Sequence, residues 1–441
     1  MRASPYLVIL SLLLGACRTV APVASIADVS PADRLRGDIG YLASARLEGR
    51  GTGTAGNDSA AAWIARRDSA LGLRPMSTDE TRAECRTAPA PVACRTFFQR
   101  FVARGPELVR AGRPDGVTTQ NVIAMIPGRE AALASEYVVI GAHYDHLGRS
   151  PNSAMDADAG DVIRPGADDN VSGAAAVLEL ARVLVASPAR RSIIIAHFTG
   201  EELGLLGSQW FVEHAPVAAD SISAMLNFDM VGRLRADRLI VYGTGTASEL
   251  PGIVSAASAG TGLSLASVAD GFGPSDQTSF YARGIPVLQF FTGLHDDYHR
   301  ASDVAERIDA AGEARVVTLA ERIVRAIADR PARLTPIRAA GPPPSVSAGP
   351  ASKVYLGTIP DMSGGTASGL ALAGVRPGSP ADAAGLRAGD VIVALGGAAV
   401  HDLYSYSAAL YSHQPGDTVV IEFVRGGAKR SATVVLGTRG G

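Results

Sequence analysis

Two adjacent carboxylates in a run of small residues constrain this chain more than any other feature. The run Gly166-Ala-Asp168-Asp169-Asn-Val-Ser172-Gly173 predicts a tight corner. The apolar residues 174–185 that follow predict a helix, with Ser172 as its N-cap. Asp168 precedes the cap, so we expect its side chain to point out of the corner. Because neighbouring carboxylates repel each other unless a cation lies between them, this corner gives a first indication of a metal site.

Short apolar runs alternate with helical patterns over the first three quarters of the chain. We expect strands at residues 120–126, 137–140, 191–198, 222–228, 238–242 and 286–291, and helices at 33–46, 60–71, 174–186, 203–212, 250–260 and 304–328. This alternation predicts an α/β fold with a mixed, mostly parallel central sheet flanked by helices. In such sheets the functional loops gather at the C-terminal ends of the strands.

Length and composition indicate more than one domain. A chain of 441 residues is too long for one ordinary core. The Pro-rich residues 331–352 predict a linker between a domain at 31–330, with an insertion near 78–96, and a smaller domain at 353–441. The net charge of −2 argues against nucleic acid as the main partner.

The N-terminus has the pattern of an export signal. An apolar stretch ends in Leu14-Gly15-Ala16-Cys17, which resembles a bacterial lipobox and makes Cys17 the expected lipidation site; an ordinary signal peptide is the alternative. Residues 1–17 are then the signal peptide and 18–30 a tether. We expect an exported lipoprotein at the periplasmic face of a bacterial membrane. Because the residue after Cys17 is Arg18 and not the acidic residue that retains lipoproteins in the inner membrane, the outer membrane is favoured. Cys85 and Cys94 remain, and an exported protein can join them as a disulfide.

Polar clusters rich in His, Asp and Glu follow four predicted strands. They are His143-Tyr-Asp145-His146, Glu201-Glu202, Asn227-Phe-Asp229 and His295-Asp-Asp-Tyr-His299. Together with Asp168 they are expected at one edge of the sheet. Buried carboxylates need compensating charge. Imidazole and carboxylate donors without thiolate suit zinc, with manganese or cobalt as the alternatives.

The order of these motifs resembles the zinc aminopeptidase family with co-catalytic metals, which also includes glutamate carboxypeptidases and glutaminyl cyclases. The resemblance covers residues 35–328. It implies two Zn²⁺ ions bridged by Asp168, with Glu202 and His299 completing one site and His143 and Asp229 the other. It further implies that Glu201 is the general base, that Asp145 orients His143, and that the Asp168–Asp169 peptide bond is cis.

The resemblance also implies the reaction. We expect an aminopeptidase that hydrolyses the N-terminal peptide bond through a metal-bridging hydroxide. Within the family, a carboxypeptidase or glutaminyl cyclase is the alternative, since Arg149, Arg164, Arg233 and Arg300 flank the motifs and are candidates to bind a substrate carboxylate. A peptide-binding adaptor with a vestigial hydrolase is the alternative from another class.

Several residues near the motifs have ordinary structural interpretations. We expect His146 and His295 not to bind metal, and His197, inside an apolar strand, to be a core histidine. Gln277 replaces the His that the family usually carries in a Ser-Asp-His segment near the substrate, which weakens a substrate role there.

The C-terminal residues resemble a bacterial PDZ domain. The run from Gly378 to Ile392 carries its Ser-Pro-Ala, Ala-Gly-Leu and Gly-Asp-Val-Ile elements, and residues 403–411 would be the groove helix. This implies a small β-rich domain. It would bind an extended peptide or a protein C-terminus at Tyr355, Leu356, Gly357 and Thr358. A closed domain that binds no peptide is the alternative.

Overall fold

The computed structural model describes residues 29–79, 85, 92–105, 108–109, 113–150, 154–273, 275–337, 354–360, 369–375, 378–400, 406, 409–410 and 412–438. Cys17, most of the tether, most of the Pro-rich linker and most of the expected groove helix therefore lie outside the described residues. Among the described residues, no helix is long and apolar enough to cross a membrane.

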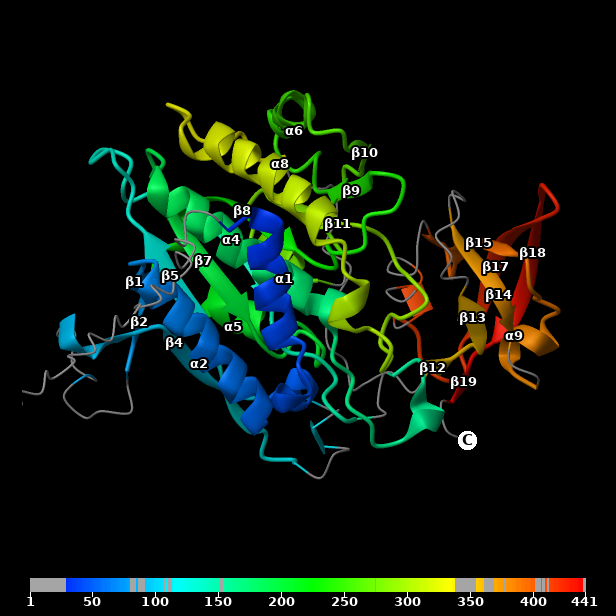
Figure 1. Cartoon of the computed structure of the whole chain (residues 1–441). Coiled ribbons are helices and arrows are strands. Elements are labelled where there is room, and N and C mark those ends of the chain that lie inside the picture. Colours follow the sequence, from blue (N-terminus) through cyan, green and yellow to red (C-terminus); the bar gives the residue numbers. More distant parts are fainter. Residues whose placement is uncertain are drawn as a thin grey trace, which may run out of the picture. The chain divides into compact units, whose positions relative to one another are not determined.

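One mixed sheet forms the centre of the N-terminal part (Figure 1). Its strands lie in the order β1-β5-β7-β6-β8-β11-β9-β10, and β4 also pairs with β5. The bounds are β1 Arg74–Pro75, β4 Phe98–Ala103, β5 Val117–Ile126, β6 Tyr137–His143, β7 Ser192–Phe198, β8 Ile222–Phe228, β9 Arg238–Tyr242, β10 Ser264–Ser267 and β11 Val287–Phe291. The central neighbours β7, β6, β8 and β11 are parallel, whereas β5 and β9 join antiparallel. The predicted mixed, mostly parallel sheet is confirmed.

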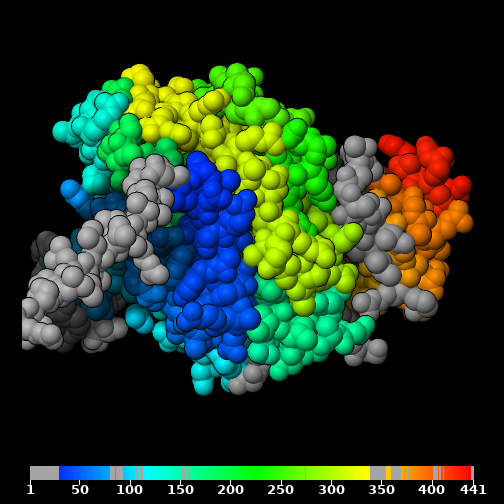
Figure 2. All heavy atoms as spheres, in the orientation of Figure 1, coloured from blue at the N-terminus to red at the C-terminus, as the bar shows by residue number. Residues whose placement is uncertain are grey.

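Helices cover both faces of this sheet. On one face α1 Pro31–Leu42, α4 Gly173–Ala186 and α8 Ala310–Ala328 pack against one another, with α6 Leu250–Ser258 against α8. Figure 2 shows α1 in blue beside α8 in yellow. Helix α2 Ala55–Ala70 packs on β5, and α5 Leu206–Glu213 with α7 Gln277–Tyr281 covers the other face. The two faces bury separate apolar clusters, which fix the directions of the strand ends.

Two predicted helix starts were wrong, and at a third helix the predicted cap was wrong. Helix α2 begins at Ala55 because Thr54 accepts a hydrogen bond from the N–H of Asn57. The last helix starts after a short 3₁₀ turn, where Asp309 accepts from the N–H of Gly312. At α4 the side chain of Asn170, and not Ser172, accepts from the N–H of Gly173.

The predicted disulfide between Cys85 and Cys94 is present, and both residues are buried. Short strands β2 Ser77–Thr78 and β3 Arg95–Thr96 pair beside it. The insertion thus leaves and rejoins the domain at a closed base.

The C-terminal part is a small antiparallel β domain. Its strands are β12 Val354–Tyr355, β13 Thr358–Pro360, β14 Leu370–Val375, β15 Val391–Leu395, β16 Ala398–Ala399, β17 Thr418–Arg425, β18 Ala428–Val435 and β19 Gly437–Thr438, with helix α9 Pro380–Ala383. The sheet order is β13-β14-β15-β17-β18, while β12 pairs with β19. Its own apolar cluster, which includes Ile392, Ile421 and Leu395, makes it a separate core.

Candidate metal centre

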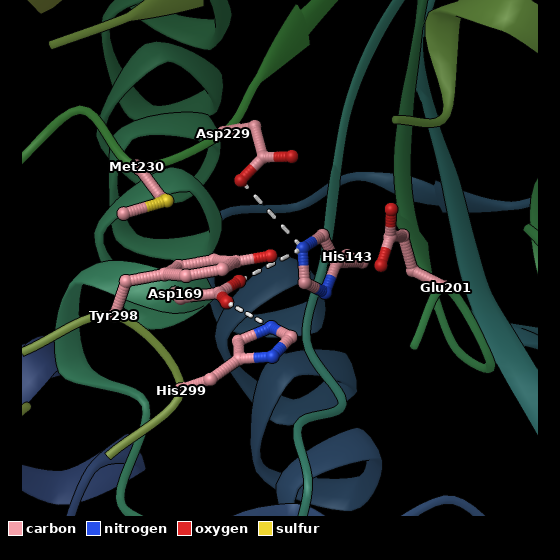
Figure 3. Close-up of a pocket in the computed structure, with 7 residues that line it drawn as sticks. All are labelled: His143, Asp169, Glu201, Asp229, Met230, Tyr298 and His299. Atoms are coloured by element: carbon pink, nitrogen blue, oxygen red, sulfur yellow. Dashed lines mark ion pairs between the residues drawn. The ribbon is translucent and has the colours of Figure 1, made fainter. Parts of the chain in front are cut away.

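The carboxyl ends of the parallel strands bring the polar clusters together. Strand β6 ends at His143, β7 ends shortly before Glu201, and β8 ends immediately before Asp229. The loop after β11 supplies Tyr298 and His299. Figure 3 shows these side chains pointing into one pocket, which is also lined by Met230.

Asp169 lies between two histidines and links two groups of donors. Its Oδ1 is 3.4 Å from His143 Nε2, and its Oδ2 is 3.1 Å from His299 Nε2. His143 Nε2 is also 3.7 Å from Asp229 Oδ1, and His299 Nε2 is 3.2 Å from Glu202 Oε2. The arrangement is therefore two sets of three donors that share one carboxylate.

These spacings fit zinc. Zinc–donor distances of about 2.0–2.1 Å at tetrahedral angles place neighbouring donor atoms about 3.3 Å apart. The four distances between donors, from 3.1 to 3.7 Å, are close to that value. His146 Nδ1 is 2.7 Å from Glu202 Oε1, which is a hydrogen-bond distance and too short for two ligands of one ion. The geometry thus favours His299 over His146 as the imidazole of the second set.

The expected bridging position of Asp168 is wrong by one residue. Asp168 Oδ1 accepts a hydrogen bond from the N–H of Gly232 at 2.7 Å, and its Oδ2 accepts from His295 Nε2 at 3.1 Å. The side chain therefore turns away from His143 and His299, and Asp169 takes the central place. The cis peptide bond shifts in the same way, since it joins Asp169 to Asn170 and not Asp168 to Asp169.

The carboxylates of the site shift the pKa values of its two histidines. Burial disfavours charged imidazole, but Glu201 and the surrounding aspartates outweigh it and raise the pKa of His143 well above its usual value. In the same way, Glu202 and Asp169 outweigh burial and raise the pKa of His299. The carboxylates thus favour positive charge beside them. A pair of divalent ions would supply that charge, so the donor set fits the group that the sequence predicts.

Glu201 has the environment of a group that exchanges protons. Burial raises the pKa of Glu201 well above its ordinary value, and Glu202 and Asp229 raise it further, although His143 opposes the shift. The carboxyl groups of Glu201 and Asp229 and the ring of His143 lie close enough to hold one ion between them. Glu201 therefore lines the pocket beside the metal donors but belongs to neither of the two donor sets that share Asp169.

Asp145 is fully buried beneath His143. His143 Nδ1 lies 3.2 Å from the backbone oxygen of Asp145 and 3.6 Å from its Oδ1. The carboxylate also accepts hydrogen bonds from Thr52 Oγ1 at 2.8 Å and from the N–H of Glu201 at 3.3 Å. Asp145 thus contacts both the ring of His143 and the loop that carries Glu201, as an orienting residue should.

Two buried residues support the loops of the site, and the first of them, Arg50, was not predicted from the sequence. The guanidinium of Arg50 is fully buried and donates to the carbonyls of Tyr144, Leu42, Pro165 and Gly166. Asp303 accepts from two backbone amides of the loop that carries Asp169. The sequence signal for Arg50 was a charged residue among the small residues of the loop Leu47-Glu-Gly-Arg50-Gly-Thr-Gly. Its burial was not visible from the sequence.

The remaining expectations concern residues beside the site. His197 is buried, neither ring nitrogen has a hydrogen-bond partner within the described chain, and burial lowers the pKa of His197 to about 3. Gln277 is buried in an amide cluster, accepting from Asn227 Nδ2 and donating to Gln289 Oε1. Asp276 next to it is fully buried, and burial raises its pKa to about 7.

Comparison with known proteins agrees with this geometry. Residues 121–324, which contain all five donors, match Peptidase family M28. This part of the chain belongs to peptidase family M28. Residues 354–436 match the PDZ domain, so the M28 peptidase part is followed by a PDZ domain.

Curated relatives match over part of their length. Leucine aminopeptidase 1 of Arthroderma otae is 39% identical over 122 residues, which are 26% of this chain and 30% of the relative. A probable zinc metalloprotease of Pyrenophora teres f. teres is 37% identical over 124 residues, 28% of this chain and 24% of the relative. The chain thus spans less than a third of the length of either relative.

Solved structures share the fold. The zinc aminopeptidase of Bacillus subtilis has a TM-score of 0.52 and 19% identity, covering 71% of this chain and 97% of that chain. The glutaminyl cyclase of Porphyromonas gingivalis has a TM-score of 0.51 and 19% identity, covering 67% and 98%. At this identity the likeness establishes the zinc-exopeptidase-like fold of the M28 domain.

Proposed function

We propose that this protein is a zinc aminopeptidase with two metal ions. The observation that carries the proposal is the placement of Asp169 between His143 and His299. His143, Asp169 and Asp229 would hold one ion, and Asp169, Glu202 and His299 the other. When bound, such ions lower the pKa of a water molecule and polarise the carbonyl of the scissile bond.

Glu201 would move the proton. Its raised pKa allows its carboxylate to accept a proton from the attacking water and, as the carboxylic acid, to return it to the nitrogen of the leaving amine. The N–H of Glu201 donates to Asp145 Oδ1, which fixes the backbone from which the carboxylate reaches the pocket.

Tyr298 would assist at the carbonyl oxygen. Its ring stacks on His299 with centroids 3.9 Å apart, and its hydroxyl lies in the same pocket (Figure 3). Burial and the nearby carboxylates of Asp169 and Glu202 raise the pKa of Tyr298 well above its usual value. The phenol therefore keeps its proton and can donate a hydrogen bond to the charge that develops on the oxygen.

The charge of the pocket favours a substrate with a free amine. Apart from its two histidines, the ionisable groups of the lining are acids and the phenol of Tyr298. Three of the four candidate arginines have other partners: Arg149 pairs with Glu48 and Asp161, Arg164 with Asp156, and Arg233 with Asp297. Arg300 does not line the pocket. A carboxypeptidase would need a cation there, so the N-terminal end is the better fit.

A peptide digest tests this proposal. Matched peptides with free, N-acetylated and C-amidated ends are incubated with zinc-loaded protein, with and without a chelator, and products are read by mass spectrometry. We expect loss of the N-terminal residue from the free and amidated peptides and none from the acetylated one. Shortening of the acetylated peptide from its C-terminus would indicate a carboxypeptidase, and formation of pyroglutamate from N-terminal Gln a cyclase. Natively purified protein without zinc would favour the adaptor.

The PDZ domain supports a second binding role. We propose that Tyr355, Leu356, Gly357 and Thr358 bind the end of an extended peptide by strand addition next to β13. The hydroxyls of Thr358 and Tyr406 are 2.6 Å apart, so a peptide must fit beside this pair. Binding of a library of peptides with free C-termini to the full chain tests the proposal. If no peptide binds at millimolar concentration, the domain is closed.

We also propose that the protein is exported and anchored through Cys17, with the outer membrane as its site. The support is the sequence alone. Labelling of expressing bacteria with a palmitate analogue should mark the wild-type chain and not Cys17→Ser. Equal labelling of both, or none of either, would contradict lipidation at Cys17.

A further inference from the structure

Asp303 connects the two loops that carry the proposed zinc donors. It follows His299 by four residues and is fully buried. Its Oδ2 accepts hydrogen bonds from the N–H of Asp168 at 2.9 Å and from the N–H of Asp169 at 3.1 Å. Its backbone oxygen accepts from the N–H of Ala167 at 3.1 Å. Three successive amides of the first loop thus end on one residue of the second.

Other contacts hold the flanks of the Asp169 loop. Before the loop, Arg50 donates to the carbonyls of Pro165 and Gly166 at 2.6 and 3.0 Å. After Asp169, the side chain of Asn170 donates to the carbonyl of Phe228 and accepts from the N–H of Gly173. Between these fixed ends, Asp303 is the side chain that bonds the N–H of Asp169 itself.

We propose that Asp303 is a positioning residue that sets zinc affinity at the set formed by Asp169, Glu202 and His299. The inference rests on the proposed zinc function. Asp303 and His299 share a loop, so the hydrogen bonds that Asp303 accepts fix Asp169 relative to His299. The distance between Asp169 Oδ2 and His299 Nε2 is 3.1 Å. A carboxylate oxygen suits this role because hydrogen bonds to an ionised acceptor are about twice as strong as neutral ones.

Another buried acid provides a matched control. Glu313 at the start of α8 is also fully buried, and its two carboxylate oxygens have no hydrogen-bond partner in the part of the chain that the structure describes. Its truncation removes a buried carboxyl group and no hydrogen bond of the Asp169 loop. A general effect of deleting a buried carboxyl group would appear at both positions, whereas positioning would appear at Asp303 alone.

The experiment compares Asp303→Ala, Asp303→Asn and Glu313→Ala with the wild-type full chain. Zinc affinities and stoichiometry are measured by competition with a chromophoric chelator, and stability of the zinc-free proteins by urea unfolding. We expect Asp303→Ala to lower the affinity for one of the two zinc ions by about 10- to 100-fold, the range typical of groups that orient metal ligands. Asp303→Asn keeps an acceptor without its charge, so we expect a loss of about 5- to 10-fold. Glu313→Ala should keep both affinities within twofold.

The outcomes separate the two proposals. If the wild type binds two zinc ions and Asp303→Asn keeps both affinities, the positioning role is wrong while the peptidase proposal stands. The role is also wrong if Glu313→Ala weakens zinc as much as Asp303→Ala does. If Asp303→Ala does not fold, the Asp303→Asn result decides. If the wild type binds no zinc, the proposed function itself fails.

Discussion

Asp68 should make the stability of the M28 domain depend on pH. The residue lies in α2, is fully buried, and neither carboxylate oxygen has a hydrogen-bond partner among the described residues. Burial raises the pKa of Asp68 from 3.8 to about 8. Below pH 8 the folded protein therefore holds a proton there that the unfolded chain releases above pH 3.8.

The direction and size of this pH effect follow from the difference between the pKa of Asp68 in the folded and unfolded states. The contribution of Asp68 to stability is fully present below pH 3.8 and is lost as the pH rises towards 8, because the unfolded state gains by ionising. At about 1.4 kcal/mol for each pH unit, the loss between pH 5 and pH 7 is about 3 kcal/mol. Asp68→Asn removes the titration while keeping the shape of the side chain.

Urea unfolding of the wild type and Asp68→Asn between pH 5 and pH 8, at saturating zinc, measures the effect. We expect the stability of the variant relative to the wild type to rise by about 3 kcal/mol from pH 5 to pH 7. Asp68→Leu, which also cannot ionise, should show the same pH slope. A difference between variant and wild type that stays constant across this range would refute the reasoning.

Three further predictions concern catalysis, acid stability and the insertion. Glu201→Gln should lower kcat by at least 100-fold with zinc content unchanged, because the amide cannot accept the proton; near wild-type turnover would exclude this role. His197→Leu should resist acid better than the wild type, by about 2 kcal/mol at pH 5 in urea unfolding. The unfolded chain protonates His197 below about pH 6.5, whereas the folded protein with a pKa of about 3 does not; equal acid sensitivity would contradict this. Replacing Cys85 and Cys94 with Ser should cost about 2–3 kcal/mol, given a sequence separation of 9, and an unchanged midpoint would mean that the loop adds no stability.

The sequence predicted the strands better than the corner at the site. The strands Ile222–Phe228 and Arg238–Tyr242 have the predicted bounds, because a continuous apolar run bounded by polar residues is a local signal. Which of Asp168 and Asp169 faces the histidines is not local. It depends on Gly232 and His295, which bond Asp168, and on Asp303, far along the chain. Adjacent identical residues leave that choice open until these distant partners are known.

The pairing of β6 with β8 gives the donor set a consequence for folding. Gly141 is opposite Asn227, so His143 and Asp229, each two residues further on, reach the edge of the sheet at matching positions. A slip of one residue between these strands would turn Asp229 to the other side of the sheet. Only molecules in which these two strands have the correct alignment would then bind the two zinc ions tightly. Zinc that binds only the native alignment would stabilise that alignment over the slipped one by mass action.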